Sequence, residues 1–151
     1  MIESPKPEPY DYLKYYRVIR YFIKAKYGLS TTDLDMLLFL YSERYFSRQK
    51  FQEFNELLSW DVKRFERLVR EGWIDLFRAH YQNVKSIYQI SLKGRRMIAS
   101  MYKKLNGEEI PVSQSNNTMF AKNVKYSDKI YRNMIKEMNA FIKQQRHQPP
   151  E

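Results

Sequence analysis

Cysteine is absent from the 151 residues, and its absence excludes several classes of protein at once. Without a thiol there is no disulfide framework, no thiolate zinc site, no catalytic cysteine and no cysteine redox switch. Histidine is almost as scarce, since the two copies, His80 and His147, lie in unrelated segments. The sequence also has no Gly-rich phosphate loop, nucleophile elbow or metal-spaced cluster. We therefore expect no metal, no cofactor and no enzymatic activity.

Long apolar runs are missing as well. The longest strongly apolar run, residues 36–41, is far shorter than the roughly 18 residues of a membrane span. Residues 1–5 have neither the basic head nor the apolar stretch of a signal peptide. With 43% hydrophobic and 29% charged residues, the composition is typical of one folded domain. These features predict a protein without membrane contact in the cytoplasm, or inside a host cell if the source is viral.

Acidic side chains are outnumbered by basic ones, 17 to 27, which gives a net charge of +10. The surplus is concentrated in residues 44–104, which carry fourteen basic and six acidic side chains. A local excess of this kind is what a surface for a polyanion requires. The alternative is that the charge serves only solubility.

Glycine is limited to four residues, and each lies where a helix is expected to end or begin. Apolar periodicity predicts helices over residues 11–27, 32–44, 48–57, 60–71, 94–105 and 126–145. Between residues 73 and 90 the period changes to about two, which predicts a hairpin with strands 73–78 and 85–90. We expect an extended lead over residues 1–10, one domain over 11–106, a polar linker or mobile loop over 107–124 and a separate helix over 125–147.

Hydroxyl residues mark the expected helix starts. Ser30, Ser47 and Ser59 each stand where a side chain can cap the helix that follows. Asp33 and Asp35 are closely spaced carboxylates at the start of the second helix, and we interpret them as capping residues rather than an acid/base pair.

The helix predicted over residues 60–71 has two different sides. Val62, Phe65, Leu68 and Val69 form an apolar stripe, whereas Lys63, Arg64, Arg67 and Arg70 fall mostly on the other side. A helix-turn-helix unit leaves one face of its second helix free for the DNA major groove, and this basic face is suited to guanine edges and phosphates. The alternative is a solvated face paired with nearby glutamates.

The connection at the tip of the hairpin is polar and basic. Its candidate DNA contacts are Arg78, His80, Gln82, Asn83 and Lys85. In this position they could reach the adjacent minor groove or the phosphate backbone. The alternative is that these side chains are exposed to solvent and contact no DNA.

Residues 29–102 resemble the winged helix-turn-helix core of MarR-type transcriptional regulators. The resemblance is carried by residues 29–35 (LSTTDLD), 67–74 (RLVREGWI) and 88–97 (YQISLKGRRM). It implies a mainly α fold with a two-stranded β wing and flanking N- and C-terminal helices. It also implies a homodimer, which helices 11–27 and 126–145 could build.

These observations predict a homodimeric transcriptional regulator that binds double-stranded DNA with helix 60–71 and the hairpin. An alternative is a winged-helix module that contacts proteins in a larger assembly, including a viral one, without a role in gene control. A weaker alternative is binding of single-stranded nucleic acid, although most of the thirteen tyrosines fall on apolar stripes and are expected in the core. The sequence does not identify an effector molecule.

Overall fold

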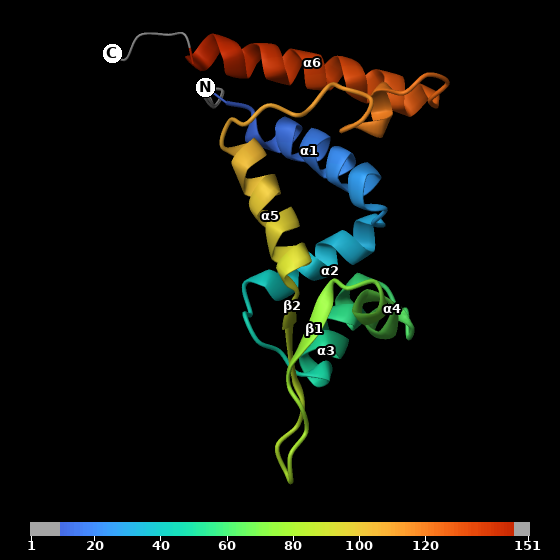
Figure 1. The fold of residues 1–151 in the computed structure, drawn as a ribbon, viewed down its shortest axis with the longest axis vertical. Helices are drawn as coiled ribbons and strands as arrows, with labels where there is room; N and C mark the ends of the chain where they lie inside the picture. The colour runs from blue at the N-terminus through green and yellow to red at the C-terminus, as the bar shows by residue number, and fades with distance from the viewer. Residues whose placement is uncertain (1–9, 147–151) are drawn as a thin grey trace, which may run out of the picture. The chain divides into compact units, whose positions relative to one another are not determined.

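The computed structural model describes residues 10–146 and is mainly helical, with one small antiparallel sheet (Figure 1). The elements in chain order are α1 (Tyr12–Tyr27), α2 (Thr31–Tyr41), α3 (Arg48–Leu58), α4 (Arg64–Arg70), β1 (Ile74–Arg78), β2 (Ile87–Ile90), α5 (Leu92–Leu105), the 3-10 turn η1 (Thr118–Phe120) and α6 (Tyr126–Arg146). The expected helix-rich fold with a β hairpin is therefore confirmed.

The chain divides into two units. The central unit is Gly28–Ser100, and the terminal unit combines the chain up to Tyr27 with the chain from Met101 onward. This division differs from the expected one, in which residues 11–106 form one domain. The expected lead over residues 1–10 lies outside the described residues except for Tyr10, and so does His147 at the end of the expected last helix.

The core of the central unit is formed around α2. This helix buries Leu34, Met36, Leu37 and Leu40 completely. Its start is fixed by Ser30, whose hydroxyl accepts a 3.1 Å hydrogen bond from the backbone N–H of Asp33. Ser47 caps α3 in the same way, by accepting from the N–H of Lys50. Both caps confirm the sequence prediction, because capping depends on residues only three positions apart.

The sheet has more than its two named strands. β1 and β2 pair in antiparallel register from Ile74 opposite Ile90 to Arg78 opposite Ile87. On the other edge of β2, Phe46 exchanges backbone hydrogen bonds of 3.0 and 2.8 Å with Tyr88. The short segment between α2 and α3 therefore extends the sheet by one residue, which the sequence analysis did not anticipate.

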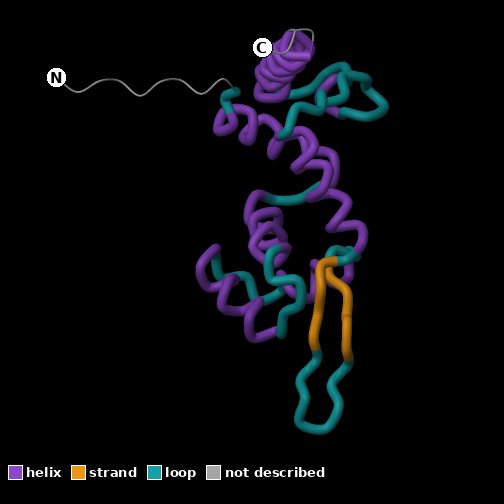
Figure 2. Tube along the Cα trace, turned by 90° about the vertical axis from the view of Figure 1, so that its left-hand side faces the viewer, coloured by secondary structure: helices purple, strands orange, loops and turns teal. Residues whose placement is uncertain are grey.

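The hairpin continues beyond the sheet as a long loop (Figure 2). At its far end the backbone of Tyr81 pairs with that of Val84, with N···O distances of 3.0 and 2.9 Å. Between them Gln82 has φ of 52°, the left-handed conformation that tight hairpin turns require. The tip is thus closed by a two-residue turn.

The terminal unit is built from both ends of the described chain. α1 packs against α6 and η1, and the rings of Tyr21 and Tyr131 stack with centroids 3.8 Å apart. α6 buries Ile135, Met138 and Ile142, so much of its apolar stripe is covered within the same chain.

The segment expected as a linker or mobile loop is packed on α6. The amide of Asn139 accepts from the N–H of Ile110 and donates to its carbonyl, both at 2.9 Å. The guanidinium of Arg132 donates to the carbonyls of Met119 and Ala121. These polar side chains hold the backbone of the segment on α6, whereas a linker or mobile loop was expected over residues 107–124.

Candidate nucleic-acid interface

α4 is shorter than the predicted helix 60–71 and begins at Arg64, with Lys63 at the N-cap position. Ser59 ends α3 instead of capping α4. Asp61 organises the turn between them, because its carboxylate accepts from the N–H of Lys63 and its carbonyl accepts from the N–H of Arg64, at 3.0 and 3.2 Å. The amide of Asn55 also donates to that carbonyl at 3.0 Å.

Arg64 was expected on the free face of this helix, but the structure buries it, with 3% of its surface exposed. Its Nε donates to Asp33 at 3.0 Å, and its terminal nitrogens donate to the carbonyl and hydroxyl of Ser59 at 2.9 and 3.0 Å. A further hydrogen bond joins it to Asn55. A guanidinium removed from water needs such partners to offset its lost hydration. Arg64 therefore joins α2, α3 and α4, and its assignment as a DNA contact was wrong.

Arg67 is also engaged with carboxylates. One terminal nitrogen lies 2.8 and 2.9 Å from the two carboxylate oxygens of Asp33, and the other lies 3.1 Å from Asp61. The hydrogen bond that Arg67 donates to Asp33 raises the pKa of Arg67. The pKa of Asp61 is lowered, first by the backbone N–H of Lys63 and then by Arg67. Asp33 therefore lies in the first turn of α2 and also forms ion pairs with both Arg64 and Arg67. The interpretation of Asp33 as a capping residue did not include these ion pairs.

The apolar stripe of α4 is narrower than expected. Phe65 and Leu68 are buried, but Val62 is 58% exposed because it precedes the helix, and Val69 is 38% exposed. Leu57 and Trp60 are also exposed, by 76% and 64%. The connection from α3 to α4 therefore presents several large apolar side chains to solvent.

Two of the four predicted basic residues remain available on α4. Lys63 and Arg70 are exposed, and within residues 10–146 neither has a carboxylate partner. Lys63 is the N-cap residue of α4 and Arg70 is its last residue, so the two lie at opposite ends of this helix. Glu66 lies between them in sequence and forms an ion pair with Arg48. The pKa of Glu66 is lowered, first by a backbone hydrogen bond, with Arg48 also contributing.

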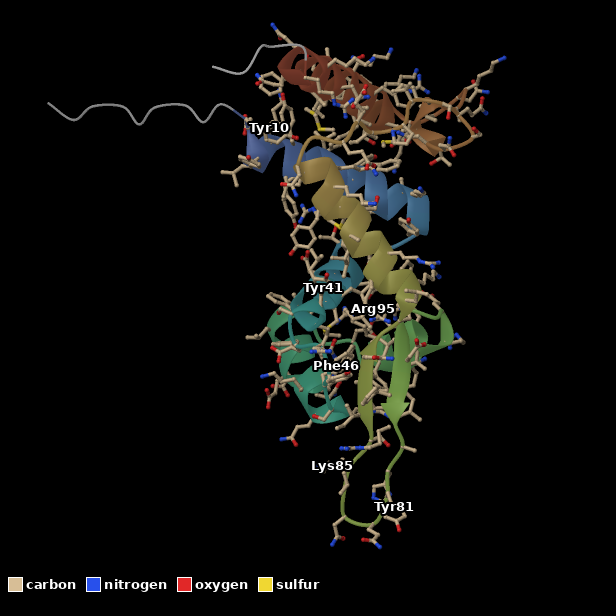
Figure 3. All side chains as sticks on the ribbon, turned by 60° about the vertical axis from the view of Figure 1, so that its left-hand side comes forward. Tyr10, Tyr41, Phe46, Tyr81, Lys85 and Arg95 are labelled. Atoms are coloured by element: carbon tan, nitrogen blue, oxygen red, sulfur yellow. The ribbon has the colours of Figure 1, made fainter. Side chains whose placement is uncertain are left out.

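The five predicted residues of the hairpin, Arg78, His80, Gln82, Asn83 and Lys85, are all exposed. The backbone N–H of His80 donates to the hydroxyl of Ser86 at 2.9 Å, which fixes one side of the loop. Lys85 and Tyr81 lie on the part of the hairpin that extends beyond the sheet (Figure 3). At the base of the hairpin β1 contacts α4, so the two groups of exposed basic residues belong to elements packed together.

Sequence reasoning missed a second group of basic side chains. Arg44 and Arg95 line a hollow of about 350 Å³ in the central unit, together with Tyr41, Tyr45 and Gln89. Their positions, 44 and 95, give no local pattern, because the turn after α2 and the start of α5 come together only in the fold.

Across the part of the chain that the structure describes, no helix combines the length and the apolar character needed to cross a bilayer. Within the same residues no three His, Asp or Glu side chains gather in a way that could hold a metal ion.

Comparisons of the whole chain with protein-family models, curated proteins and solved structures give no match.

Proposed function

We propose that the chain is a winged helix-turn-helix protein of the MarR-like type that binds double-stranded DNA as a transcriptional regulator. The observation that carries the proposal is the pairing of Phe46 with Tyr88. It adds a sheet segment between α2 and α3, so the central unit has the order helix, sheet segment, helix, helix, hairpin that is typical of winged-helix domains. The hairpin that extends beyond the sheet takes the place of the wing (Figure 2).

The proposed contacts are the exposed basic residues. Arg70 lies on α4 and Lys63 at its N-cap position, and a major groove about 12 Å wide admits one helix. Arg78 and Lys85 flank the tip of the hairpin, where His80, Gln82 and Asn83 could contact the minor groove or the phosphates. Arg64 and Arg67 have a supporting role in this proposal, since their ion pairs hold α4 against α2 and α3.

A homodimer remains part of the proposal, with a changed physical argument. The apolar side of α6 is covered in part by α1 and by η1 of the same chain. What favours self-association is the apolar surface left on these two helices, where Leu13 is 85% exposed and Tyr126 is 77% exposed. Light scattering coupled to size-exclusion chromatography would measure the mass, and a monomer at every concentration would remove the dimer from the proposal.

Two paired variants test DNA binding. Lys63→Gln/Arg70→Gln removes the exposed cations of α4, and Arg78→Gln/Lys85→Gln removes those of the hairpin. A matched control is Lys122→Gln/Lys125→Gln, which removes two exposed cations from the terminal unit. Affinity for a mixed-sequence duplex is measured by fluorescence anisotropy at several salt concentrations.

The four proposed cations, one phosphate contact each, predict how binding depends on salt. The logarithm of the association constant should fall with the logarithm of the salt concentration with a slope of about −4 for one bound chain and about −7 for two. Each test pair should weaken binding at least about tenfold and reduce the slope by about two per chain, whereas the control pair should leave both unchanged. No complex with any duplex, or a complex that salt does not weaken, would refute the proposed function.

A second candidate function is protein binding through the central unit. It is favoured by the exposed side chains of Leu57 in the last turn of α3 and of Trp60 and Val62 on the connection to α4. Solvent-exposed apolar clusters are characteristic of interaction sites. Trp60→Ser/Val62→Ser removes most of this surface without changing any charge. If that variant loses a partner in cells while both basic pairs retain theirs and duplex binding is absent, the second function replaces the first.

A further inference from the structure

A hollow of about 350 Å³ lies in the central unit between the end of α2, the turn that follows it, β2 and the start of α5. Its deepest lining residues are Leu40 and Ile90, whose exposed fractions are 0% and 3%. Tyr41 and Arg95, which both line the hollow, are labelled in Figure 3. Small-molecule sites are concave, have an apolar floor and few polar groups, and occupy about 300–1,000 Å³. The hollow has this kind of lining, and its volume lies near the lower limit of the range.

Two guanidinium groups border the hollow. Arg44 comes from the turn after α2, where backbone hydrogen bonds from Glu43 to Leu40 and from Tyr45 to Glu43 measure 3.0 and 2.7 Å. Its φ is 63°, a left-handed conformation that is uncommon for an arginine. Arg95 comes from the first turn of α5, where its N–H donates to the carbonyl of Ser91 at 2.9 Å. Two separate elements therefore bring these cations to one place.

Neither arginine is neutralised within residues 10–146. Both are exposed, and the residues that line the hollow include no carboxylate. Two hollows of the terminal unit differ in this respect, because Lys143 beside one and Arg146 beside the other pair with Glu109 at 3.4 and 3.1 Å, although Lys136 beside the first has no carboxylate partner among the described residues. The local charge of the central hollow therefore favours an anion with a charge of about two.

The remaining lining groups suit a flat ring. Tyr41 and Tyr45 contribute phenol rings, and the ring of Tyr45 lies against that of Phe77 with centroids 4.3 Å apart, which restrains its position. The amide of Gln89 offers both a donor and an acceptor beside them. Aromatic side chains stack on nucleobases of any kind, and an amide can hydrogen-bond to a base edge.

We propose that this hollow binds a small organic phosphate that carries a flat ring, such as a nucleoside monophosphate. Arg44 and Arg95 contact the phosphate, because a guanidinium matches phosphate oxygens with a planar, charged donor fork. Tyr41 stacks on the ring, Gln89 hydrogen-bonds to its edge, and Leu40 and Ile90 form the floor, while Tyr45 lies against Phe77 and beneath the guanidinium of Arg44. The site does not depend on the proposed DNA contacts, which are different residues.

The test uses the full chain without DNA. Isothermal titration calorimetry measures binding of the four common ribonucleoside 5′-monophosphates, with inorganic phosphate and the four unphosphorylated nucleosides as separate arms. The test variants are Arg95→Gln and Arg44→Gly. Glycine adopts positive φ without strain, so Arg44→Gly removes the guanidinium while retaining the turn. The control is Arg96→Gln, which changes an exposed arginine next to Arg95 that does not line the hollow.

At least one monophosphate should bind with one site per chain, and inorganic phosphate and the matching nucleoside should each bind at least about tenfold more weakly. Each test variant should weaken binding about tenfold to a hundredfold, the usual effect of losing a charge-assisted hydrogen bond, and Arg96→Gln should not. Three results would overturn the proposal: no binding of any monophosphate, binding of inorganic phosphate as tight as that of the nucleotide, or equal affinity in the wild type and both test variants. A single-stranded oligonucleotide that competes for these arginines with higher affinity than its mononucleotides would also overturn it, because the occupant would then be a polymer.

Discussion

Replacing Asp33 by asparagine should destabilise the central unit more than any other single change of a charged residue on α2. The carboxylate of Asp33 is 8% exposed and accepts from Arg64 at 3.0 Å and from Arg67 at 2.8 and 2.9 Å. Asparagine has nearly the same shape but carries no charge. The substitution therefore leaves a buried guanidinium without its closest counter-ion, and brings an amide N–H group toward it.

Breaking a buried ion pair by removing one partner costs about 3–5 kcal/mol. Arg64 keeps its hydrogen bonds to Asn55 and Ser59, so we expect the lower end, about 3 kcal/mol. A protein of this size loses about 2–4 °C in Tm per kcal/mol, which predicts a fall of about 6–12 °C. Against a total free energy of unfolding of about 5–15 kcal/mol, the loss is a large fraction.

Urea unfolding followed by tryptophan fluorescence isolates this effect. Trp60 and Trp73 are the two tryptophans of the chain, and both lie in the central unit. The control is Asp35→Asn on the same helix, since Asp35 is half-buried and forms no ion pair with the residues that the structure describes. It should change the free energy of unfolding by less than about 0.5 kcal/mol.

A double-mutant cycle completes the test. Arg64→Met alone should also destabilise, and its combination with Asp33→Asn should cost at least about 1 kcal/mol less than the sum of the two single changes. If Asp33→Asn is as stable as Asp35→Asn, or if the cycle is additive, the network does not hold α4 in place. The burial of Arg64 would then have no energetic role.

Three further predictions concern pH, a hydrogen bond and packing. The folded chain lowers the pKa of Asp61 through the N–H of Lys63 and then Arg67, so its carboxylate stabilises the fold above the unfolded pKa of about 4 and loses this effect as the pH falls through the lowered folded pKa. Asp61→Asn should therefore be less stable than wild type at pH 7, and the difference in urea midpoint should shrink as the pH falls below about 4. Tyr21→Phe removes a 2.6 Å hydrogen bond to Asp128 and should cost about 1 kcal/mol, with the stacked ring retained, which the Tm from circular dichroism would show. Gly94→Ala places a Cβ 2.4 Å from Ile90 and 3.3 Å from the carbonyl of Trp73, and should cost about 1–3 kcal/mol in the fluorescence assay; an unchanged midpoint would mean that α5 shifts freely.

The helices and the hairpin could be predicted because their signals are local. The expected helix 11–27 is observed as Tyr12–Tyr27 and the expected helix 126–145 as Tyr126–Arg146. Both predictions were made from apolar periodicity, which is a local property of the sequence. Ser30 and Ser47 cap helices as expected. Ser59 does not, because Asp61 two residues later organises the same turn, and propensity alone does not choose between the two.

The candidate site was harder to predict because the charge of a side chain does not show whether that side chain is buried or exposed. Arg64 and Lys63 are adjacent in sequence and both basic, yet one is buried and the other is exposed. The difference depends on Asp33, 31 residues away from Arg64, whose position is set by the packing of α2. Reversing the charge of Arg64 would therefore test folding rather than DNA binding, whereas Lys63 and Arg70 allow a test on the surface.

The terminal unit also has a consequence for biosynthesis. α1 is made early, but the partner that covers it, α6, is the last helix of the described chain, roughly a hundred residues later. At about 5–20 residues per second a ribosome needs about 5–20 s to reach it. During that interval α1, which buries Val18, Ile19, Phe22 and Ile23 in the finished protein, lacks one of the helices that pack against it. A nascent chain stalled before residue 126 should therefore recruit chaperones through α1, and one that includes α6 should release them.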